Sequence, residues 1–247
     1  MTSFAIIIPA YNEEAYLAAT MAAVREAMKE VELIGELIVV NNNSSDGTAE
    51  VARSEGADQV VFEPHNQIAR ARNAGAAATD AEYLVFVDAD TCLNVETLRT
   101  ALSFLQSGSV AAGGARMEVD QEVSVMVGFL VASWNRTAAF FKYAAGSFFF
   151  CRRDVFHECG GFDETVYAGE EVWFARRIKK WARARGMTFE VISDSPIVTS
   201  GRKSDWYSNF DFIRQLAVIF LIPWSTRSKR FCSMWYSRPG DSSELQP

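Results

Sequence analysis

The sequence predicts an α/β protein whose mostly parallel, twisted sheet is flanked by helices on both faces. Apolar runs rich in β-branched and aromatic residues recur along residues 1–108, and most are followed by a helix-forming segment. The connections between these segments are short, and polar residues cluster where the apolar runs end. Strands and helices that alternate with short connections favour parallel strands joined by right-handed crossovers.

The first half of the chain contains four strand–helix units. Strands are expected at 4–8, 36–40, 59–62 and 83–87, and helices at 15–29, 49–55, 68–79 and 95–105. Pro9 ends the first strand, and Glu13 and Glu14 precede the helix that follows, where the helix macrodipole favours negative charge. The polar turn at 41–48 offers several N-cap residues for the next helix.

The pattern changes after Gly108. A strand at 110–117, broken at Gly113-Gly114, precedes an apolar, aromatic helix that we interpret as a core helix. The remaining elements are expected at 123–143 (that helix), 145–152 (strand), 154–159 (helix), 172–185 (helix), and 189–192 and 196–198 (short extended pieces). The helix at 172–185 has apolar residues at helical spacing along one face, and we interpret its cations as the solvated faces.

Composition restricts the class of function. The 247 residues are 49% hydrophobic and 22% charged, which is ordinary for a globular protein. The net charge of −7 is uneven, because residues 1–150 carry 9 basic and 19 acidic side chains and residues 151–247 carry 15 basic and 12 acidic ones. An acidic first half argues against a nucleic-acid partner, whose phosphates call for cations. The basic second half suits phosphates or an anionic membrane surface.

The cysteine and histidine content argues against a zinc site. The four cysteines show no C-x-x-C spacing, and only two histidines are present. No basic leader precedes the first strand, and no window of about 18 apolar residues is uninterrupted. The sequence therefore predicts a cytoplasmic protein with reduced thiols.

Two carboxylates stand at the end of the most apolar strand. Asp88 and Asp90 follow 83–87 at i and i+2, a spacing that puts both side chains on one side of an extended chain. Ligands of open α/β sheets bind outside the carboxyl ends of the strands, and paired carboxylates suit Mg²⁺ or Mn²⁺ shared with phosphates. The alternative is a solvated turn that caps the next helix. Neither G-x-G-x-x-G nor a P-loop motif occurs, so dinucleotide enzymes and P-loop NTPases fit poorly.

An ordered set of motifs resembles the family 2 glycosyltransferases of the GT-A fold. The set comprises Ile8-Pro9-Ala10-Tyr11-Asn12-Glu13-Glu14, Asn43-Ser44-Ser45-Asp46-Gly47-Thr48, Ala71-Arg72-Asn73-Ala74-Gly75, Asp88-Ala89-Asp90, Gly161-Phe162-Asp163-Glu164 and Gly169-Glu170-Glu171. The resemblance implies an inverting transferase of hexosyltransferase type that uses a nucleoside-diphosphate sugar. It also implies a GT-A domain over 1–205, with a donor half (1–108) and an acceptor half (109–205), followed by an aromatic and basic extension at 206–247.

The resemblance assigns residues to the donor side. Those that line the nucleoside pocket would be Pro9, Ala10, Tyr11 and Glu13, with Arg72 and Asn73 in support and Gly75 allowing close backbone approach. Asn41 stands where the family often has an acidic residue, which leaves the nucleotide base open.

The same resemblance assigns the metal and the phosphates. Asp90 would hold Mg²⁺ or Mn²⁺, assisted by Asp88 directly or through the ribose, to stabilise the charge of the diphosphate leaving group. Arg202 and Lys203 would close over the phosphates. The alternative for these two cations is a plain surface loop.

Inversion also needs a base that takes the acceptor's hydroxyl proton. The family usually places an acidic pair at the start of the helix after the Gly-Phe-Asp turn, which makes Glu171 the first candidate and Glu170 the second. The alternative is that both simply favour the helix N-terminus.

Two other functions and several partners stay open. A sugar-nucleotide nucleotidyltransferase would need a glycine-rich, basic loop where this chain has Pro9 to Glu14, and a non-catalytic homologue would not need both carboxylate pairs. The acceptor is a saccharide or a lipid-linked molecule. The functional alternative for the helix at 123–143 is an acceptor-side wall or a surface that contacts lipid. The aromatic segments at 134–150 and 210–224, the second followed by Arg227, Lys229 and Arg230, suit a lipid-linked acceptor and peripheral membrane contact, with a core helix or a homodimer contact as the alternative for the tail.

Overall fold

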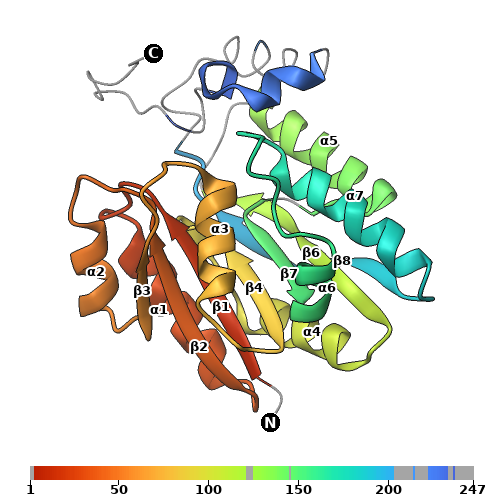
Figure 1. The fold of residues 1–247 in the computed structure, drawn as a ribbon, viewed down its shortest axis with the longest axis horizontal. Coiled ribbons are helices and arrows are strands. Elements are labelled where there is room, and N and C mark those ends of the chain that lie inside the picture. Colours follow the sequence, from red (N-terminus) through yellow and green to blue (C-terminus); the bar gives the residue numbers. More distant parts are fainter. Residues whose placement is uncertain are drawn as a thin grey trace.

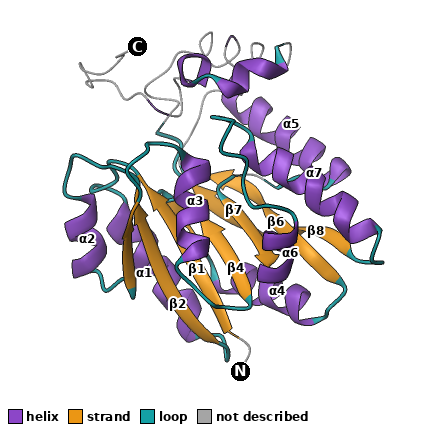
Figure 2. Ribbon diagram, viewed as in Figure 1, coloured by secondary structure: helices purple, strands orange, loops and turns teal. Residues whose placement is uncertain are grey.

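The computed structural model describes residues 3–120, 125–144, 146–202, 214, 222–232 and 236. One eight-stranded sheet in the order β3-β2-β1-β4-β7-β6-β8-β5 forms the centre, and helices cover both of its faces (Figures 1 and 2). The strands are β1 (Ser3–Ala10), β2 (Ile34–Asn41), β3 (Gln59–Phe62), β4 (Tyr83–Val87), β5 (Thr91–Cys92), β6 (Val110–Val119), β7 (Phe148–Arg152) and β8 (Thr188–Thr199). The helices are α1 (Leu17–Lys29), α2 (Thr48–Ser54), α3 (Ile68–Ala77), α4 (Val95–Gln106), α5 (Val125–Phe141), α6 (Arg153–Glu158) and α7 (Glu170–Arg183), with short 3₁₀ turns at Pro223–Arg227 and Lys229–Cys232.

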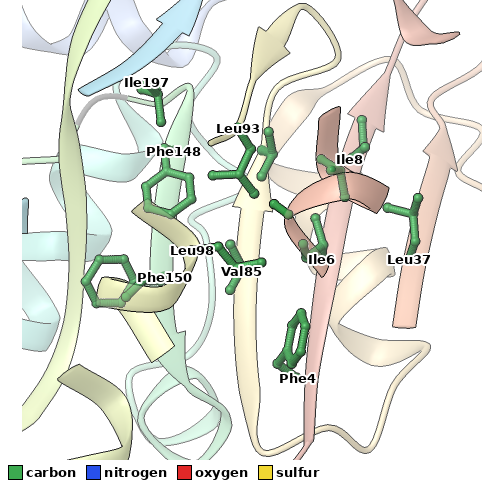
Figure 3. Packing of buried hydrophobic residues seen from close by; sticks show 14 of the residues in the cluster. Phe4, Ile6, Ile8, Leu37, Val85, Leu93, Leu98, Phe148, Phe150 and Ile197 are labelled. Atoms are coloured by element: carbon green, nitrogen blue, oxygen red, sulfur yellow. The ribbon is translucent and has the colours of Figure 1, made fainter. Parts of the chain in front are cut away.

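Alternating side chains of the central strands form two cores. Ile6 and Ile8 of β1 join the cluster beneath α1 and α4, which also holds Val85, Leu98 and Phe150 (Figure 3). The opposite face of the same strands packs against α3, α6 and α7. Burial of one such side chain contributes about 1.5–3 kcal/mol, so the central strands are the most strongly fixed part of the fold.

The predicted α/β fold is confirmed, and its sheet is mixed. Pairs β1–β2, β1–β4, β2–β3 and β6–β8 are parallel, whereas β7 runs antiparallel to both β4 and β6 and β5 runs antiparallel to β8. The first half therefore follows the predicted strand–helix alternation, and β7 reverses the direction where the second half joins it.

Several element boundaries differ from the predictions. β1 continues through Pro9 to Ala10. Its pairing with β4 ends at Ile7, so Pro9 is paired only with β2, and a proline is tolerated where one side of a strand is unpaired. β6 runs unbroken through Gly113 and Gly114, where a Cβ would lie 2.3 Å from the Glu190 carbonyl oxygen and 2.4 Å from the Ala144 Cβ. These glycines allow close packing instead of breaking the strand. The two extended pieces after residue 188 are one strand, β8.

Helix α5 is not a core helix. Phe129, Phe140 and Phe141 are all exposed on it, and only Ala138 among its described side chains is buried. Among the residues that the structure describes, no helix combines the length and apolar character needed to cross a membrane. Most of the predicted extension at 206–247, including Phe210, lies outside the described residues.

Candidate functional site

The candidate site lies at the carboxyl ends of β1, β2 and β4. The chain runs from β1 outward to β2 and β3, and then returns to place β4 on the other side of β1. Ligands of open α/β sheets bind at such a reversal of strand order. Asp88 follows β4 directly, so the topology brings it to the edge where the loop after β1 begins.

The loops after β1 and β2 hold each other in place. The Asn12 N–H donates to Ser44 Oγ (3.0 Å), and the Glu13 N–H donates to Thr48 Oγ1 (2.7 Å). Asn12 has a left-handed backbone (φ 52°), which asparagine tolerates better than most residues. Asn41, the last residue of β2, accepts the Ser44 N–H at 2.9 Å. The polar turn predicted at 41–48 thus gives this edge its fixed shape.

The residues predicted for a nucleoside pocket start from this edge. Pro9 and Ala10 are the buried last residues of β1, and Tyr11 follows them half-buried. Asn41 uses its side-chain oxygen within its own turn. Contact between these four residues and a nucleoside stays a prediction.

Asp88 and Asp90 each face an arginine. Asp88 Oδ1 lies 2.9 Å from Arg72 Nη2, and Asp90 Oδ2 lies 3.0 Å from Arg202 Nη2. Within the described ranges, no group of three or more His, Cys, Asp or Glu side chains converges on a metal position. Mg²⁺ often uses one or two protein carboxylates together with phosphate oxygens. The two aspartates therefore fit a divalent ion that takes its remaining ligands from a phosphate-bearing molecule.

Arg202 is not part of a plain surface loop. Its guanidinium makes a bidentate pair with Glu13, at 2.7 and 2.6 Å, and lies 4.3 Å from the centre of the Tyr16 ring. Burial disfavours the charge, but Glu13 and Asp90 outweigh it and raise the pKa of Arg202. Lys203, the other predicted cation, lies outside the described residues.

Arg72 joins the edge at β4 to the start of α7. The side chain is 1% exposed, and its guanidinium donates to Glu170 Oε1 (2.6 Å), Asp88 Oδ1 (2.9 Å) and the Gly146 carbonyl (2.7 Å). Burial opposes its charge, but Asp88 and Glu170 outweigh it and raise the pKa of Arg72. The sequence places Arg72 near the site but does not reveal this bridge.

The two glutamates that open α7 have different surroundings. Glu170 is buried and ion-paired with Arg72. Glu171 is partly buried, and a Cβ added at Gly146 would lie 3.5 Å from its Cδ. Burial, followed by the neighbouring charge of Glu170, raises the pKa of Glu171 to about 8, although Arg72 acts against this rise. A carboxyl with such a pKa suits proton transfer near neutral pH.

Two residues of α3 have structural roles that the sequence alone does not reveal. Asn73 donates to the Phe162 carbonyl (3.0 Å) and accepts the Phe162 N–H (2.9 Å), so it holds the turn at 160–164. A Cβ at Gly75 would lie 2.3 Å from Ile7 Cγ2, which shows that this glycine lets α3 pack closely on β1. Nucleoside contact by Arg72 or Asn73 stays a prediction.

Asn42 and Gln67 also hold this edge in place, a role that the sequence does not predict. Buried Asn42 donates to the His65 carbonyl (2.6 Å) and accepts the Gln67 N–H (2.9 Å). Gln67 in turn donates to the Glu164 and Val166 carbonyls, at 2.8 and 2.9 Å. The polar run 41–48 marks Asn42, but only the fold shows that it connects to the second half.

Comparison with known proteins identifies the relatives of this chain. A family model described as "Glycosyl transferase family 2" matches residues 5–160. An uncharacterized glycosyltransferase of Mycobacterium tuberculosis is 33% identical over 133 residues, which cover 53% of this chain and 57% of that protein. The O-antigen chain rhamnosyltransferase WbaN of Salmonella anatum is 25% identical over 194 residues, or 72% of this chain and 61% of that protein. The matches thus span less than two thirds of these relatives.

Solved structures share the fold. One is glucosyl-3-phosphoglycerate synthase from Mycobacterium tuberculosis, in complex with Mn²⁺, UDP and glucosyl-3-phosphoglycerate. Its TM-score with this chain is 0.65 at 15% identity, and the match covers 94% of this chain and 80% of that protein. Another is the mannosyltransferase PcManGT from Pyrobaculum calidifontis, in complex with GDP-Man and Mn²⁺. Its TM-score is 0.64 at 21% identity, and the match covers 92% of this chain and 64% of that protein.

Proposed function

Because the chain belongs to glycosyl transferase family 2, we propose that it moves a sugar from a nucleoside-diphosphate sugar to an acceptor hydroxyl, with inversion at the sugar. Its sheet has the architecture of the GT-A glycosyltransferases. The observation that supports the proposal best is the Arg72 bridge, which sets Asp88 at the donor edge beside the acidic pair of α7. One guanidinium thus joins a site for a leaving group to a site for a base.

The donor would bind at the edge formed by β1, β2 and β4, with its diphosphate near Asp88 and Asp90. These aspartates would hold Mg²⁺ or Mn²⁺, which neutralises the charge that develops on a diphosphate leaving group. Solved neighbours that contain Mn²⁺ with GDP-Man or with UDP support this assignment.

Arg202 would serve the phosphates once the donor is bound. In the structure its guanidinium contacts Asp90 and Glu13, so positive charge already stands at the edge that a diphosphate would approach. Arginine binds phosphate oxygens through several N–H groups at once, which makes exchange of partners chemically simple.

Glu171 would act as the general base. It would take the proton from the acceptor hydroxyl as that oxygen attacks the anomeric carbon from the side opposite the leaving diphosphate. Glu170, already paired with Arg72, would hold the start of α7 in position. In this division of labour, Glu171 is the base and Glu170 is a positioning residue.

The acceptor half is proposed to be 109–205, with 1–108 as the donor half and 206–247 as an extension. The acceptor would be a saccharide or a lipid-linked molecule. The similarity to an O-antigen chain rhamnosyltransferase supports an acceptor used in cell-envelope polysaccharide.

Donor binding tests the proposal most directly. We expect UDP-, GDP- or dTDP-sugars to raise the melting temperature of the purified chain only when Mg²⁺ or Mn²⁺ is present, because a ligand of the native state stabilises it by mass action. Asp90→Ala should abolish this shift, whereas Glu55→Ala, at the exposed end of α2, should retain it. If no sugar nucleotide binds with either metal, the proposed function is wrong.

A further inference from the structure

Helix α5 exposes several large apolar side chains to solvent. Met126, Phe129, Phe140 and Phe141 are 41%, 69%, 80% and 55% exposed. Its polar Asn135 instead turns inward, donating to the Met117 carbonyl (2.7 Å) and accepting the Met117 N–H (3.2 Å). The exposed face also carries Ser133, Arg136 and Thr137, while Ala138 is buried. Large apolar side chains gathered on an exposed helix mark a contact surface.

Cations lie among and beside these apolar side chains. Arg136 is exposed on α5 itself, and Lys142 follows its end. Helix α7 lies beside α5 (Figure 1): Lys179 Nζ donates to the Phe141 carbonyl (2.6 Å), and Arg176 Nε donates to the Tyr143 hydroxyl (3.2 Å). A groove of about 370 Å³ along α7 is lined by Tyr143, which follows α5, and by Arg176, Lys179, Lys180, Arg183 and Ala184.

Few acidic side chains balance this charge. Residues 125–141 and 172–183 contain no aspartate or glutamate, and Glu190 pairs with Lys142 at 2.8 Å. Burial, followed by the charges of Arg176 and Lys142, lowers the pKa of Lys179 to about 8, as expected where cations crowd together. An anionic surface placed over the groove would relieve this repulsion.

We propose that the exposed side of α5 and the cations of α7, together the α5–α7 face, dock this protein on an anionic lipid surface. Aromatic side chains that insert among lipid headgroups, bordered by Lys and Arg that contact lipid phosphates, are the recurring features of peripheral membrane helices. The contact is interfacial, and α5 lies along the membrane instead of crossing it.

Charge distinguishes this partner from a second copy of the chain. A symmetric dimer uses the same patch on both subunits, so the cations of the two α5–α7 faces would meet each other. Lipid phosphates instead supply the missing negative charge. The basic face also contrasts with the net charge of −7 for the whole chain, which would repel an anionic membrane elsewhere.

The face adjoins the candidate site through one helix. Helix α7 carries Glu170 and Glu171 in its first turn and the cations in its later turns, and its 14 residues span about 21 Å. Resting on the proposed function, this arrangement would hold the base near the headgroup layer and favour a lipid-linked acceptor. The docking itself does not depend on that function.

Vesicle flotation of the full chain tests the proposal. We expect the protein to float with vesicles of phosphatidylcholine and phosphatidylglycerol, to stay at the bottom with phosphatidylcholine alone, and to be released by salt. Lys180→Gln with Arg183→Gln should lower the partition coefficient about 25-fold, since each cation near such a surface contributes about five-fold. Phe140→Ser with Phe141→Ser should lower it as well.

Matched variants control for indirect effects. Phe62→Ser changes a phenylalanine on β3 whose exposure (61%) lies between those of Phe140 and Phe141, and Arg53→Glu changes an exposed cation on α2, so both should float like the original chain. Melting curves confirm folding of every variant, and the metal-dependent donor shift, measured on the same samples, tests the proposed function separately.

Four outcomes would overturn the docking proposal. They are no flotation with anionic vesicles, equal flotation with phosphatidylcholine alone, flotation unchanged by the α5–α7 variants, and a dimer that dissociates on Phe140→Ser with Phe141→Ser without any binding to vesicles. The last result would identify the face as an interface between copies. Loss of flotation with an intact donor shift supports docking, and loss of the donor shift alone counts only against the proposed function.

Discussion

The raised pKa of Glu171 makes a quantitative prediction about the pH dependence of transfer. A general base must be ionised to accept a proton, and the pH profile of kcat/KM reports the pKa values of the free enzyme. In the structure, burial and then the charge of Glu170 raise the pKa of Glu171 from 4.5 to about 8. Activity should therefore climb with pH across the neutral range.

The size of the rise follows from the fraction of Glu171 that is ionised. With a pKa of about 8, roughly 1% is ionised at pH 6, roughly 10% at pH 7 and roughly 90% at pH 9. We expect kcat/KM to increase about nine-fold from pH 6 to pH 7 and about five-fold from pH 7 to pH 8, and then to level off, a total of about 90-fold between pH 6 and pH 9. A glutamate of ordinary pKa would give a flat profile over this range.

The assay is initial-rate transfer at saturating metal, with donor binding measured at each pH so that a binding effect is not mistaken for a catalytic one. Glu171→Gln should bind donor, lose at least about 10²-fold in turnover and lose the rising limb. Glu170→Gln should keep the limb but shift it to lower pH, because the charge of Glu170 is the second-largest cause of the raised pKa. A flat wild-type profile, or a Glu171→Gln variant with the full rise, would refute the assignment.

Stability gives an independent check with the sign fixed by linkage. The folded-state pKa of Glu171 is higher than its unfolded value, so the folded state binds the proton more tightly. The free energy of unfolding should then decrease as the pH rises from about 4.5 towards 8, and Glu171→Gln should remove this part of the decrease. Urea denaturation across that pH window measures it without any substrate.

Three further substitutions test the packing and charges around the site. Arg72→Met should lower the free energy of unfolding, measured in urea, by about 3–5 kcal/mol, because it leaves Glu170 buried without its cation. Adding Glu170→Gln should restore part of this loss. If the effects of the two substitutions simply add, the pairing is contradicted. Arg202→Gln should raise the affinity of the donor-free protein for Mn²⁺ about ten-fold, because the guanidinium no longer competes with the ion for Asp90. Electron paramagnetic resonance measures this affinity, and an unchanged value would mean that the ion binds elsewhere. Gly75→Ala should cost about 1–3 kcal/mol in the same urea assay through overpacking of α3 on β1, and a neutral effect would show that the helix can move aside.

The position of Asp88 at the carboxyl edge of the sheet could be predicted because its determinants are local. The apolar run at 83–87 identifies β4 as buried on both faces, and Asp88 follows where such a strand must end. The polar turn after β2 likewise marks the neighbouring loop. Because parallel strands present their carboxyl ends at one edge of a sheet, Asp88 and the turn after β2 are expected to lie at the same edge.

The links between the halves could not be predicted, since their partners are far apart in sequence. Arg202 and Glu13 are 189 residues apart, and Arg72 and Glu170 are 98 apart. The sequence shows arginines and glutamates but not which of them meet. The antiparallel direction of β7 could not be predicted either, because an apolar strand pattern does not indicate the direction in which the strand runs.

Helix α5 shows a different limit. Apolar composition predicts that a helix avoids water, but it does not say whether protein or lipid replaces the water. Asn135 faces the sheet and Phe140 faces away, so large apolar side chains of α5 remain exposed. The hydrogen bonds of Asn135 and the burial of Ala138 show this orientation.

Charge balance, more than sequence position, separates the two glutamates of α7. Three acids, Asp88, Glu170 and Glu171, surround Arg72, and the guanidinium makes its contacts with the first two. No ion pair of Glu171 is seen among the described residues, and burial followed by the charge of Glu170 raises its pKa to about 8. The cation that holds Asp88 and Glu170 thus leaves Glu171 with a pKa near neutral pH. A carboxyl whose pKa lies near the working pH is the one suited to take a proton from an acceptor and release it again.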